Sequence, residues 1–495
     1  MTESPAHRPQ LITYVDRLGG DLAGLTDLLE GPLGGVFGGV HLLPYFTPFD
    51  GADAGFDPED HAQVDPRLGT WDGVAALART HSVMSDVIVN HVSAASAMHR
   101  DVLERGAESP WEPMFLTLGS VFPDGATEQD LARIYRPRPG LPFTVMTWGG
   151  ERRLVWTTFT ADQVDIDLRS DQAWAYLTHV IDTMVASGVT LLRLDAVGYT
   201  GKEPGTDCFM TEATAVYTER IMALAHERGA QVLLEVHGHH TQQIDLAPTV
   251  DYVYDFALPP LVLHALHAQD LDPLSRWLDM RPANAFTVLD THDGIGIVDV
   301  GASDLVPGEP GLLEPAQIDA LVESIHDASG GGSRLATGAA ASNLDLYQVN
   351  CTFYDALGRD DRRYLLARLI QLMTPGTPQV YYVGLLAGAN DTDLLERTGV
   401  GRDVNRHHYT RDEVEAALAS PVVEAQVAAI RLRGEHPGFG GEFSHALSGS
   451  RGTLRWKAAD ATVTLDFDVA DATFSLVATD PSGEPWELTH AALEV

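Results

Sequence analysis

Short apolar runs alternate with stretches of helical periodicity from the N-terminus to about residue 430. The runs predict strands at residues 11–15, 40–46, 83–89, 189–197 and 380–383. The periodic stretches predict helices at residues 21–29, 71–79 and 171–185, the last ending before Gly188. Strands that alternate with helices pair in parallel, because each helix returns the chain to the same end of the sheet. The pattern therefore predicts an α/β protein built on a (β/α)8 TIM barrel.

Two stretches interrupt this alternation, and the pattern changes near the C-terminus. Residues 89–169 are rich in proline, glycine and aromatic residues, and residues 295–358 contain glycine- and alanine-rich runs that favour mobile backbone. After residue 438 strict alternation of apolar and polar positions predicts a small antiparallel β domain. We therefore expect a barrel from residues 1–88, 170–294 and 359–438, inserted subdomains at 89–169 and 295–358, and a C-terminal β-sheet domain at 439–495.

Three carboxylates, Asp195, Glu235 and Asp293, each stand just after an apolar run. In a parallel barrel the C-terminal ends of the strands open onto one face, where catalytic groups collect. Two carboxylates are enough to cleave a glycosidic bond, and a third can stabilise the cation that forms. The sequence therefore predicts a sugar-cleaving site built from these three residues.

Neighbouring residues suggest separate roles for these acids. Arg193 lies two positions before Asp195, hence on the same strand face, and a buried arginine paired with it would keep Asp195 ionised, as a nucleophile must be. Glu235 is flanked by aliphatic residues, which favours the protonated form that a general acid needs. Each acid also has a structural alternative: a helix cap at Asp195, a buried ion pair at Glu235 and an Asp-Gly turn at Asp293. His91, which follows the apolar run at residues 83–89, is a further candidate for a sugar contact, and its alternative is a core position.

Composition narrows the classes of partner and the compartment. The 70 acidic and 32 basic residues give a net charge of −38, which argues against nucleic acid or an anionic membrane as a partner. No apolar run approaches the roughly 18 residues that span a bilayer, and the first ten residues lack the apolar core of a secretory signal. We expect a cytoplasmic protein. Cys208 and Cys351 are expected to be free thiols, although a disulfide between them is an alternative.

Four segments together resemble the motifs of glycoside hydrolase family 13, the α-amylase superfamily. They are, in order, Asp86-x-x-x-Asn90-His91, Arg193-x-Asp195, Glu235 and His292-Asp293. Beyond these motifs, nearly the whole chain is similar to the sucrose phosphorylases of that family. The segments that carry this closer similarity are residues 11–14, 46–56, 135–143, 341–350 and 401–406.

The resemblance implies a double displacement, with Asp195 as nucleophile, Glu235 as acid/base and Asp293 as transition-state stabiliser. It implies that sucrose and inorganic phosphate give α-glucose 1-phosphate and fructose, without a cofactor or catalytic metal, in a homodimer. Around the bound glucose it places Asp53, Phe56, His91, Phe159, Arg193, His292 and Arg402. On the acceptor side it places Tyr135, Pro137, Arg138, Tyr199, His237, Asp345, Tyr347 and Gln348.

One segment departs from the pattern that the resemblance implies. Gly238-His239-His240 stands where we expect a tyrosine-containing segment, so the details of the acceptor side stay open. The alternatives are a phosphorylase that uses glycerate, glycerol or fructose 6-phosphate, a sucrose or α-glucoside hydrolase, and a barrel that has lost catalysis and acts as a scaffold. The glycine- and alanine-rich run before Asn343 predicts a loop that moves between the two half-reactions.

Overall fold

The computed structural model describes residues 8–51, 53–136, 140–303, 306, 308–337, 348–481 and 485–493. Its central feature is a closed barrel of eight strands, as the alternating pattern predicts. In barrel order the strands are β1 (Gln10–Thr13), β16 (Thr377–Tyr381), β13 (Ala285–Thr287), β12 (Tyr252–Asp255), β11 (Gln231–Leu234), β10 (Val189–Asp195), β5 (Ser82–Ile88) and β2 (Gly39–Leu42). The chain separates by contacts into two compact units.

The first unit comprises Asp21–Ala23 and Leu42–Val236. It contains three barrel strands, and β10 pairs in parallel with both β5 and β11. Antiparallel pairs form between β3 (Phe46–Thr47) and β4 (Asp60–Val64), β6 (His91–Ser93) and β9 (Gln163–Asp165), and β7 (Phe143–Trp148) and β8 (Glu151–Trp156). The helices are α3 (Trp71–Leu77), α4 (Ala97–Arg105), α5 (Leu118–Val121), α6 (Glu128–Arg133), α7 (Asp171–Ala186) and α8 (Glu212–Glu227).

Helix α7 shows how local sequence sets an element of this unit. The Ser170 side chain accepts a hydrogen bond from the Ala173 backbone N–H and caps the first turn. Apolar residues from Ala173 to Met184 recur at helical spacing and are buried. Gly188 follows the helix with a φ of +91°, which is open to glycine and strained for other residues. The predicted end of this helix is confirmed.

The second unit comprises Met1–Gly20, Gly24–His41 and His237–Val495. Strands β1, β16, β13 and β12 are neighbours in its part of the barrel. A short antiparallel pair joins β14 (Ile295–Gly296) to β15 (Gln348–Val349). The helices are α1 (Val15–Leu18), α2 (Leu22–Glu30, whose first two residues belong to the first unit), α9 (His240–Leu246), α10 (Leu258–Ala268), α11 (Asp272–Met280), α12 (Pro315–Ala328), α13 (Gly332–Ala336), α14 (Phe353–Ala356), α15 (Asp361–Met373), α16 (Tyr382–Leu385), α17 (Thr392–Thr398), α18 (Arg411–Leu418) and α19 (Pro421–Glu435).

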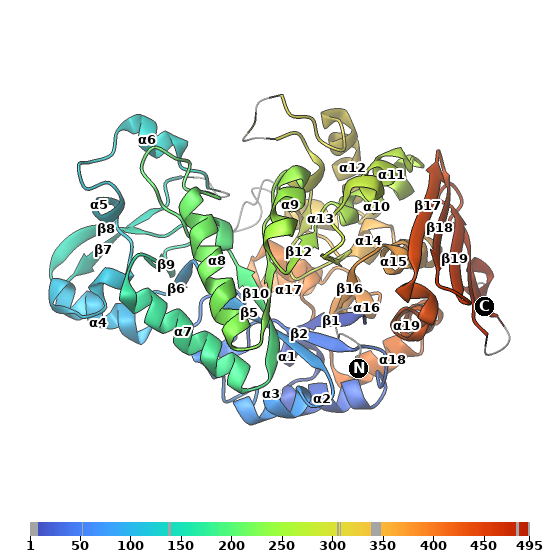
Figure 1. The fold of residues 1–495 in the computed structure, drawn as a ribbon, viewed down its shortest axis with the longest axis horizontal. Helices are drawn as coiled ribbons and strands as arrows, with labels where there is room; N and C mark the ends of the chain where they lie inside the picture. Colours follow the sequence, from blue (N-terminus) through green and yellow to red (C-terminus); the bar gives the residue numbers. More distant parts are fainter. Residues whose placement is uncertain are drawn as a thin grey trace. The chain divides into compact units, whose positions relative to one another are not determined.

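The C-terminal residues of this unit form a five-stranded antiparallel sheet, drawn in red in Figure 1. Its strands are β17 (Glu442–Ser448), β18 (Arg451–Lys457), β19 (Thr462–Asp468), β20 (Thr473–Thr479) and β21 (Trp486–Thr489). Alternate residues are buried, and the Trp456 indole N–H donates to the Met373 carbonyl of α15 at 2.7 Å. One face of the sheet therefore packs on the barrel helices, and the predicted antiparallel β domain is confirmed.

Several predicted boundaries are wrong. Residues 40–46 are not one strand: β2 ends at Leu42, and Phe46 starts β3 after Pro44, which has no N–H to donate. Residues 380–383 are strand only to Tyr381, because α16 begins at Tyr382. The short strand β12 and helix α8 are absent from the predicted elements.

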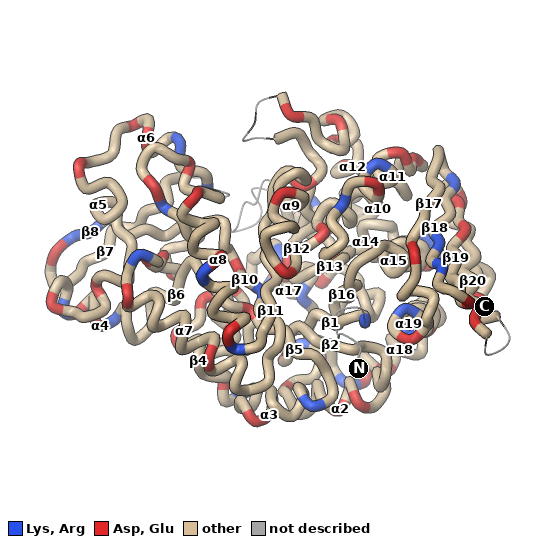
Figure 2. The backbone as a smooth tube through the Cα atoms, viewed as in Figure 1, with Lys and Arg blue, Asp and Glu red and all other residues tan. Residues whose placement is uncertain are grey.

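The distribution of charge and the state of the two cysteines agree with the expectations from the sequence. Figure 2 shows acidic positions in red recurring along the whole described backbone and outnumbering the blue basic ones. Both cysteines, Cys208 and Cys351, are buried and free, which confirms the expectation of two thiols. Within the described ranges, no helix is long and apolar enough to cross a membrane.

Candidate active site

A single guanidinium group links three carboxylates at the C-terminal end of β10. Parallel pairing puts Arg193 of β10 opposite Asp86 of β5, and Arg193 donates a hydrogen bond to Asp86. The same Nη1 lies 3.0 Å from Asp195 Oδ1, and Nη2 lies 3.7 Å from Glu235 Oε1. The Arg193 side chain is only 3% exposed. Since one planar group contacts both Asp195 and Glu235, these two carboxylates face the same space.

This cluster tests two expectations about the acids. Arg193 pairs with Asp195 as predicted, and its side chain is buried. The surroundings of Glu235 are more polar than its aliphatic neighbours in the sequence suggest. Its Oε2 accepts from the Ala196 backbone N–H at 3.2 Å, in addition to the nearby guanidinium. Ala196 itself has a φ of 55°, in the left-handed region of the backbone.

Aromatic and amide groups surround this cluster in the same unit. The Arg193 guanidinium lies 5.7 Å from the centre of the Phe56 ring. His91 Nε2 lies 3.0 Å from the Phe56 carbonyl oxygen, and burial lowers the pKa of His91, so its ring is neutral near pH 7. The Gln163 amide nitrogen lies 3.4 Å from Asp53 Oδ2 and 3.2 Å from His91 Nε2. Gln163 was missed from sequence, because no motif marks it.

An aromatic wall continues from His91. The rings of His91 and Phe159 lie 5.3 Å apart, and those of Phe159 and Tyr199 lie 5.1 Å apart, both edge to face. Tyr135 stacks on Tyr199 at 6.2 Å. The structure thus brings together Phe159, Tyr135 and Tyr199, which the sequence analysis assigned to the substrate.

Lys202 connects the aromatic residue Tyr199 to strand β9 and to the end of β5. Its side chain is 2% exposed, and Nζ lies 2.7 Å from Asp165 Oδ2 and 2.9 Å from Asn90 Oδ1. It also donates to the Tyr199 carbonyl oxygen. Because Asn90 follows β5 and Asp165 ends β9, one buried ammonium group ties the segment after Asp195 to both strands. One signal of this residue is visible in the sequence, since the chain has only two lysines.

In the other unit Asp293 is surrounded by cations. Arg402 Nη1 lies 2.8 Å from Asp293 Oδ1, Arg406 Nη2 lies 3.9 Å from the same oxygen, and His292 Nε2 lies 3.8 Å from Oδ2. Although burial opposes ionisation, Arg402, His292 and Arg406 hold the pKa of Asp293 far below its ordinary value. Arg406 was missed from sequence, although it closes the segment 401–406.

His237 and the segment after it belong to the same unit. The His237 ring stacks on Phe256 with centroids 3.9 Å apart. His239 and His240 are buried, and His239 Nε2 lies 3.1 Å from the Pro310 carbonyl oxygen. A Cβ at Gly238 would lie 2.0 Å from Gln242 Oε1, so a larger residue there requires the Gln242 amide to move. The two histidines that depart from the expected pattern are therefore packed into the fold.

Of the remaining predicted residues, the structure describes only some. Gln348 is buried, and its Oε1 accepts from the Gly294 backbone N–H at 3.2 Å. Pro137, Arg138, Asp345 and Tyr347 lie outside the described residues, as does most of the predicted mobile loop.

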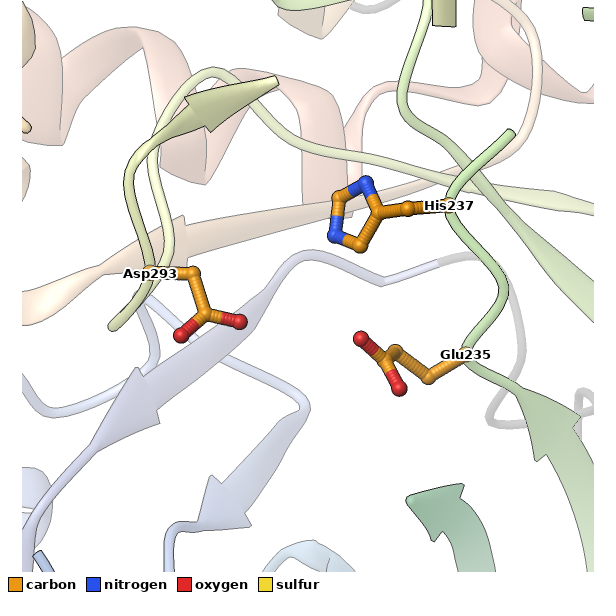
Figure 3. Close-up of side chains that lie close together, drawn as sticks. All are labelled: Glu235, His237 and Asp293. Atoms are coloured by element: carbon orange, nitrogen blue, oxygen red, sulfur yellow. The ribbon is translucent and has the colours of Figure 1, made fainter. Parts of the chain in front are cut away.

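Figure 3 shows the side chains of His237 and Asp293, which belong to the same unit, turned toward each other. One nitrogen of His237 and one oxygen of Asp293 lie within 4.8 Å of each other. These residue types can ligate a cation. However, Asp293 is already paired with Arg402, so a metal would face compensating positive charge.

Comparisons with known proteins place this geometry in context. Residues 7–245 match the family model described as "Alpha amylase, catalytic domain". The chain is 53% identical to a sucrose phosphorylase of Bifidobacterium adolescentis over 93% of this chain and 92% of the relative. It is 56% identical to a sucrose phosphorylase of Agrobacterium vitis over 88% of this chain and 90% of the relative. The crystal structure of sucrose 6F-phosphate phosphorylase from Thermoanaerobacter thermosaccharolyticum superimposes with a TM-score of 0.89 at 35% identity, covering 98% of each chain.

Proposed function

We infer the function of this chain from the family to which it belongs, glycoside hydrolase family 13, the α-amylase superfamily. We propose that it is a sucrose phosphorylase, which converts sucrose and inorganic phosphate into α-glucose 1-phosphate and fructose. Identities of 53% and 56% to two sucrose phosphorylases support this substrate. The relative that acts on sucrose 6F-phosphate is more distant, at 35% identity.

The observation that carries the mechanism is the contact of one guanidinium with Asp195 and Glu235. In the first displacement Asp195 attacks the anomeric carbon of the glucosyl unit, and the bond from that carbon to the fructosyl oxygen breaks. Glu235 gives its proton to the departing oxygen, so fructose leaves uncharged. A covalent β-glucosyl ester on Asp195 results. Carboxyl groups that face the same space suit this retaining course.

Asp293 and its cations form the proposed third part of the site. The two arginines keep the Asp293 carboxylate ionised, and an anion near the anomeric centre stabilises the positive charge that develops there. We assign Asp53 and Arg402 to the far hydroxyls of the glucose, with His91, Arg193 and His292 around the same ring and Phe56 as an aromatic platform. Phe159 shapes the wall beside the sugar.

In the second displacement a phosphate oxygen bonds to the anomeric carbon, and the ester bond to Asp195 breaks and returns its electron pair to the carboxylate. Glu235 takes a proton back from the phosphate group and is ready for the next cycle. Phosphate is already anionic and needs little help from a base. Its difficulty is repulsion, because like charges about 4 Å apart interact by roughly 4 kcal/mol at an effective dielectric of 20. We assign Arg138 and His237 as local cations, and Tyr135, Pro137, Tyr199, Asp345, Tyr347 and Gln348 as the rest of the acceptor side.

Product analysis tests this function. Purified protein incubated with sucrose and inorganic phosphate is expected to release equal amounts of α-glucose 1-phosphate and fructose. Free glucose in place of the phosphate ester would identify a hydrolase. The reverse reaction, from α-glucose 1-phosphate with fructose, glycerol, glycerate or fructose 6-phosphate in turn, ranks the alternative acceptors. Glu235→Gln is expected to lower kcat for sucrose about 10²–10⁴-fold.

The proposal also covers the compartment, the number of subunits, the cofactor and the domain division. We propose a cytoplasmic homodimer without a metal or other cofactor. We also retain the predicted division into a barrel, two inserted subdomains and a C-terminal domain. Gel filtration with light scattering measures the number of subunits.

A further inference from the structure

A fully buried carboxylate, Asp299, lies behind the His237 ring. Asp299 belongs to a single helical turn, Val298–Val300, and is 0% exposed. Its Oδ2 lies 3.1 Å from His237 Nδ1. Its Oδ1 accepts from the Gly238 backbone N–H at 3.2 Å and from the Gln243 amide at 3.3 Å. Asp299 thus holds both the ring of His237 and the backbone that follows it.

The surrounding residues allow little change in this contact. The His237 ring is stacked on Phe256 with an interplanar angle of 15°. On the other side, a Cβ added at Gly296 would lie 2.5 Å from Asp299 Oδ2 and 3.4 Å from His237 Nδ1. Glycine at this position therefore leaves just enough room for the carboxylate to meet the imidazole.

The contact fixes where the imidazole carries its proton. A carboxylate accepts hydrogen bonds only, so Nδ1 of His237 donates to Asp299. The charge of Asp299 also favours the imidazolium form over the neutral ring. Figure 3 shows the other ring nitrogen, which is Nε2, turned toward the Asp293 carboxylate. When the ring is protonated, Nε2 is a charged N–H donor.

We propose that Asp299 is a positioning residue that keeps His237 charged and oriented toward the phosphate acceptor. This inference rests on the proposed function and deepens it, because it identifies how phosphate is admitted among carboxylates. A charged donor forms a shorter and roughly twice stronger hydrogen bond to a phosphate oxygen than a neutral one. Sucrose is uncharged and gains much less from the same charge.

Asp299→Asn is the single substitution that tests this role most directly. The Gly238 N–H and the Gln243 amide both need an acceptor at the Oδ1 position. The new amide oxygen must therefore stay there, and its NH2 group then faces Nδ1 of His237. The ring becomes neutral, with its proton on Nε2. The shape of the residue is retained while the charge is lost.

The experiment measures KM for phosphate and KM for sucrose separately in the phosphorolysis assay. We expect Asp299→Asn to raise KM for phosphate about tenfold and to change KM for sucrose less than about twofold. Glu309→Gln is the matched control, because Glu309 lies 3.9 Å from His239. This substitution removes a nearby carboxylate that pairs with His239 and leaves the contact between Asp299 and His237 in place. The control should leave both constants unchanged.

Two further variants separate positioning from a purely structural effect. In a His237→Gln background, Asp299→Asn should add nothing to the rise in KM for phosphate, because Asp299 acts through the ring. Gly296→Ala displaces the carboxylate by a different route and should reproduce the effect, which keeps the test valid if Asp299→Asn does not fold.

Acidity gives a second readout. Asp293 and Asp299 both face the His237 ring and favour its charged form, so the loss of Asp299 leaves the Asp293 carboxylate in place. The pH above which KM for phosphate rises should accordingly shift downward in Asp299→Asn. Equal rises in both KM values, an unchanged KM for phosphate in a folded variant, or additivity with His237→Gln would overturn the inference. A wild type that forms no α-glucose 1-phosphate would instead overturn the proposed function.

Discussion

Replacing Arg193 by glutamine probes the charge cluster at the end of β10. The side chain is 3% exposed and compensates Asp86, Asp195 and Glu235 at once. Removing one partner of a buried ion pair leaves an uncompensated charge, which costs about 3–5 kcal/mol. Asp86 is fully buried and cannot exchange the guanidinium for water.

The expected shift in unfolding temperature follows from chain length. Unfolding entropy is about 2.1 cal/mol/K per residue, so a cooperative chain of 495 residues has about 1 kcal/mol/K at its midpoint. A loss of about 3–5 kcal/mol should therefore lower the unfolding temperature by about 3–5 °C. Differential scanning calorimetry measures this shift, and sucrose phosphorolysis should fall in parallel because Asp195 loses the cation that favours its ionised form.

Two variants calibrate the result. Arg105→Gln removes a pair with Asp101 whose side chains are 50% and 29% exposed, and it should cost only about 0.3–0.5 kcal/mol. Arg193→Lys keeps the charge but cannot contact several carboxylates with a planar fork, so its activity should lie between those of wild type and Arg193→Gln. If Arg193→Gln unfolds within a degree of Arg105→Gln, the assigned role of the buried cluster is wrong.

Three further changes test other parts of the structure. Lys202→Met leaves Asp165 without its buried cation and should lower stability by about 3–5 kcal/mol, whereas Lys457→Met, at an exposed lysine, should leave the calorimetric midpoint nearly unchanged. Because the pKa of Asp293 lies far below its ordinary value, its stabilising effect is complete above about pH 4 and declines as the pH falls further. The difference in unfolding temperature between wild type and Asp293→Asn should thus narrow below about pH 4, and a constant difference would contradict the assignment. Burial raises the pKa of the Cys351 thiol to about 12, so a thiol reagent should leave Cys351 unmodified in native protein. After denaturation the reagent should count two thiols. A count of one or none in the denatured protein would contradict the free state of both cysteines.

Local patterns account for the elements that the sequence predicted well. Helix α7 carries its own cap at Ser170, its own apolar face and its own stop at Gly188, so every signal lies within about twenty residues. The C-terminal strands are likewise marked by alternation within each strand. Strand β12, by contrast, has only four residues and includes Asp255, which three partners hold in the core. Its burial depends on Trp277 and Arg281, which no local pattern in residues 252–255 reveals.

The sequence by itself determined that Asp195 and Glu235 stand at strand ends. It also determined that Arg193 shares a face with Asp195, because a period of two is a property of any strand. Only the tertiary structure decided which groups support them. Gln163, Lys202, Asp299 and Arg406 are buried polar residues whose partners, apart from near neighbours such as the Tyr199 carbonyl, lie mostly tens of positions away along the chain. A buried charge is stable only beside its partner, and that pairing exists only when distant segments are folded together.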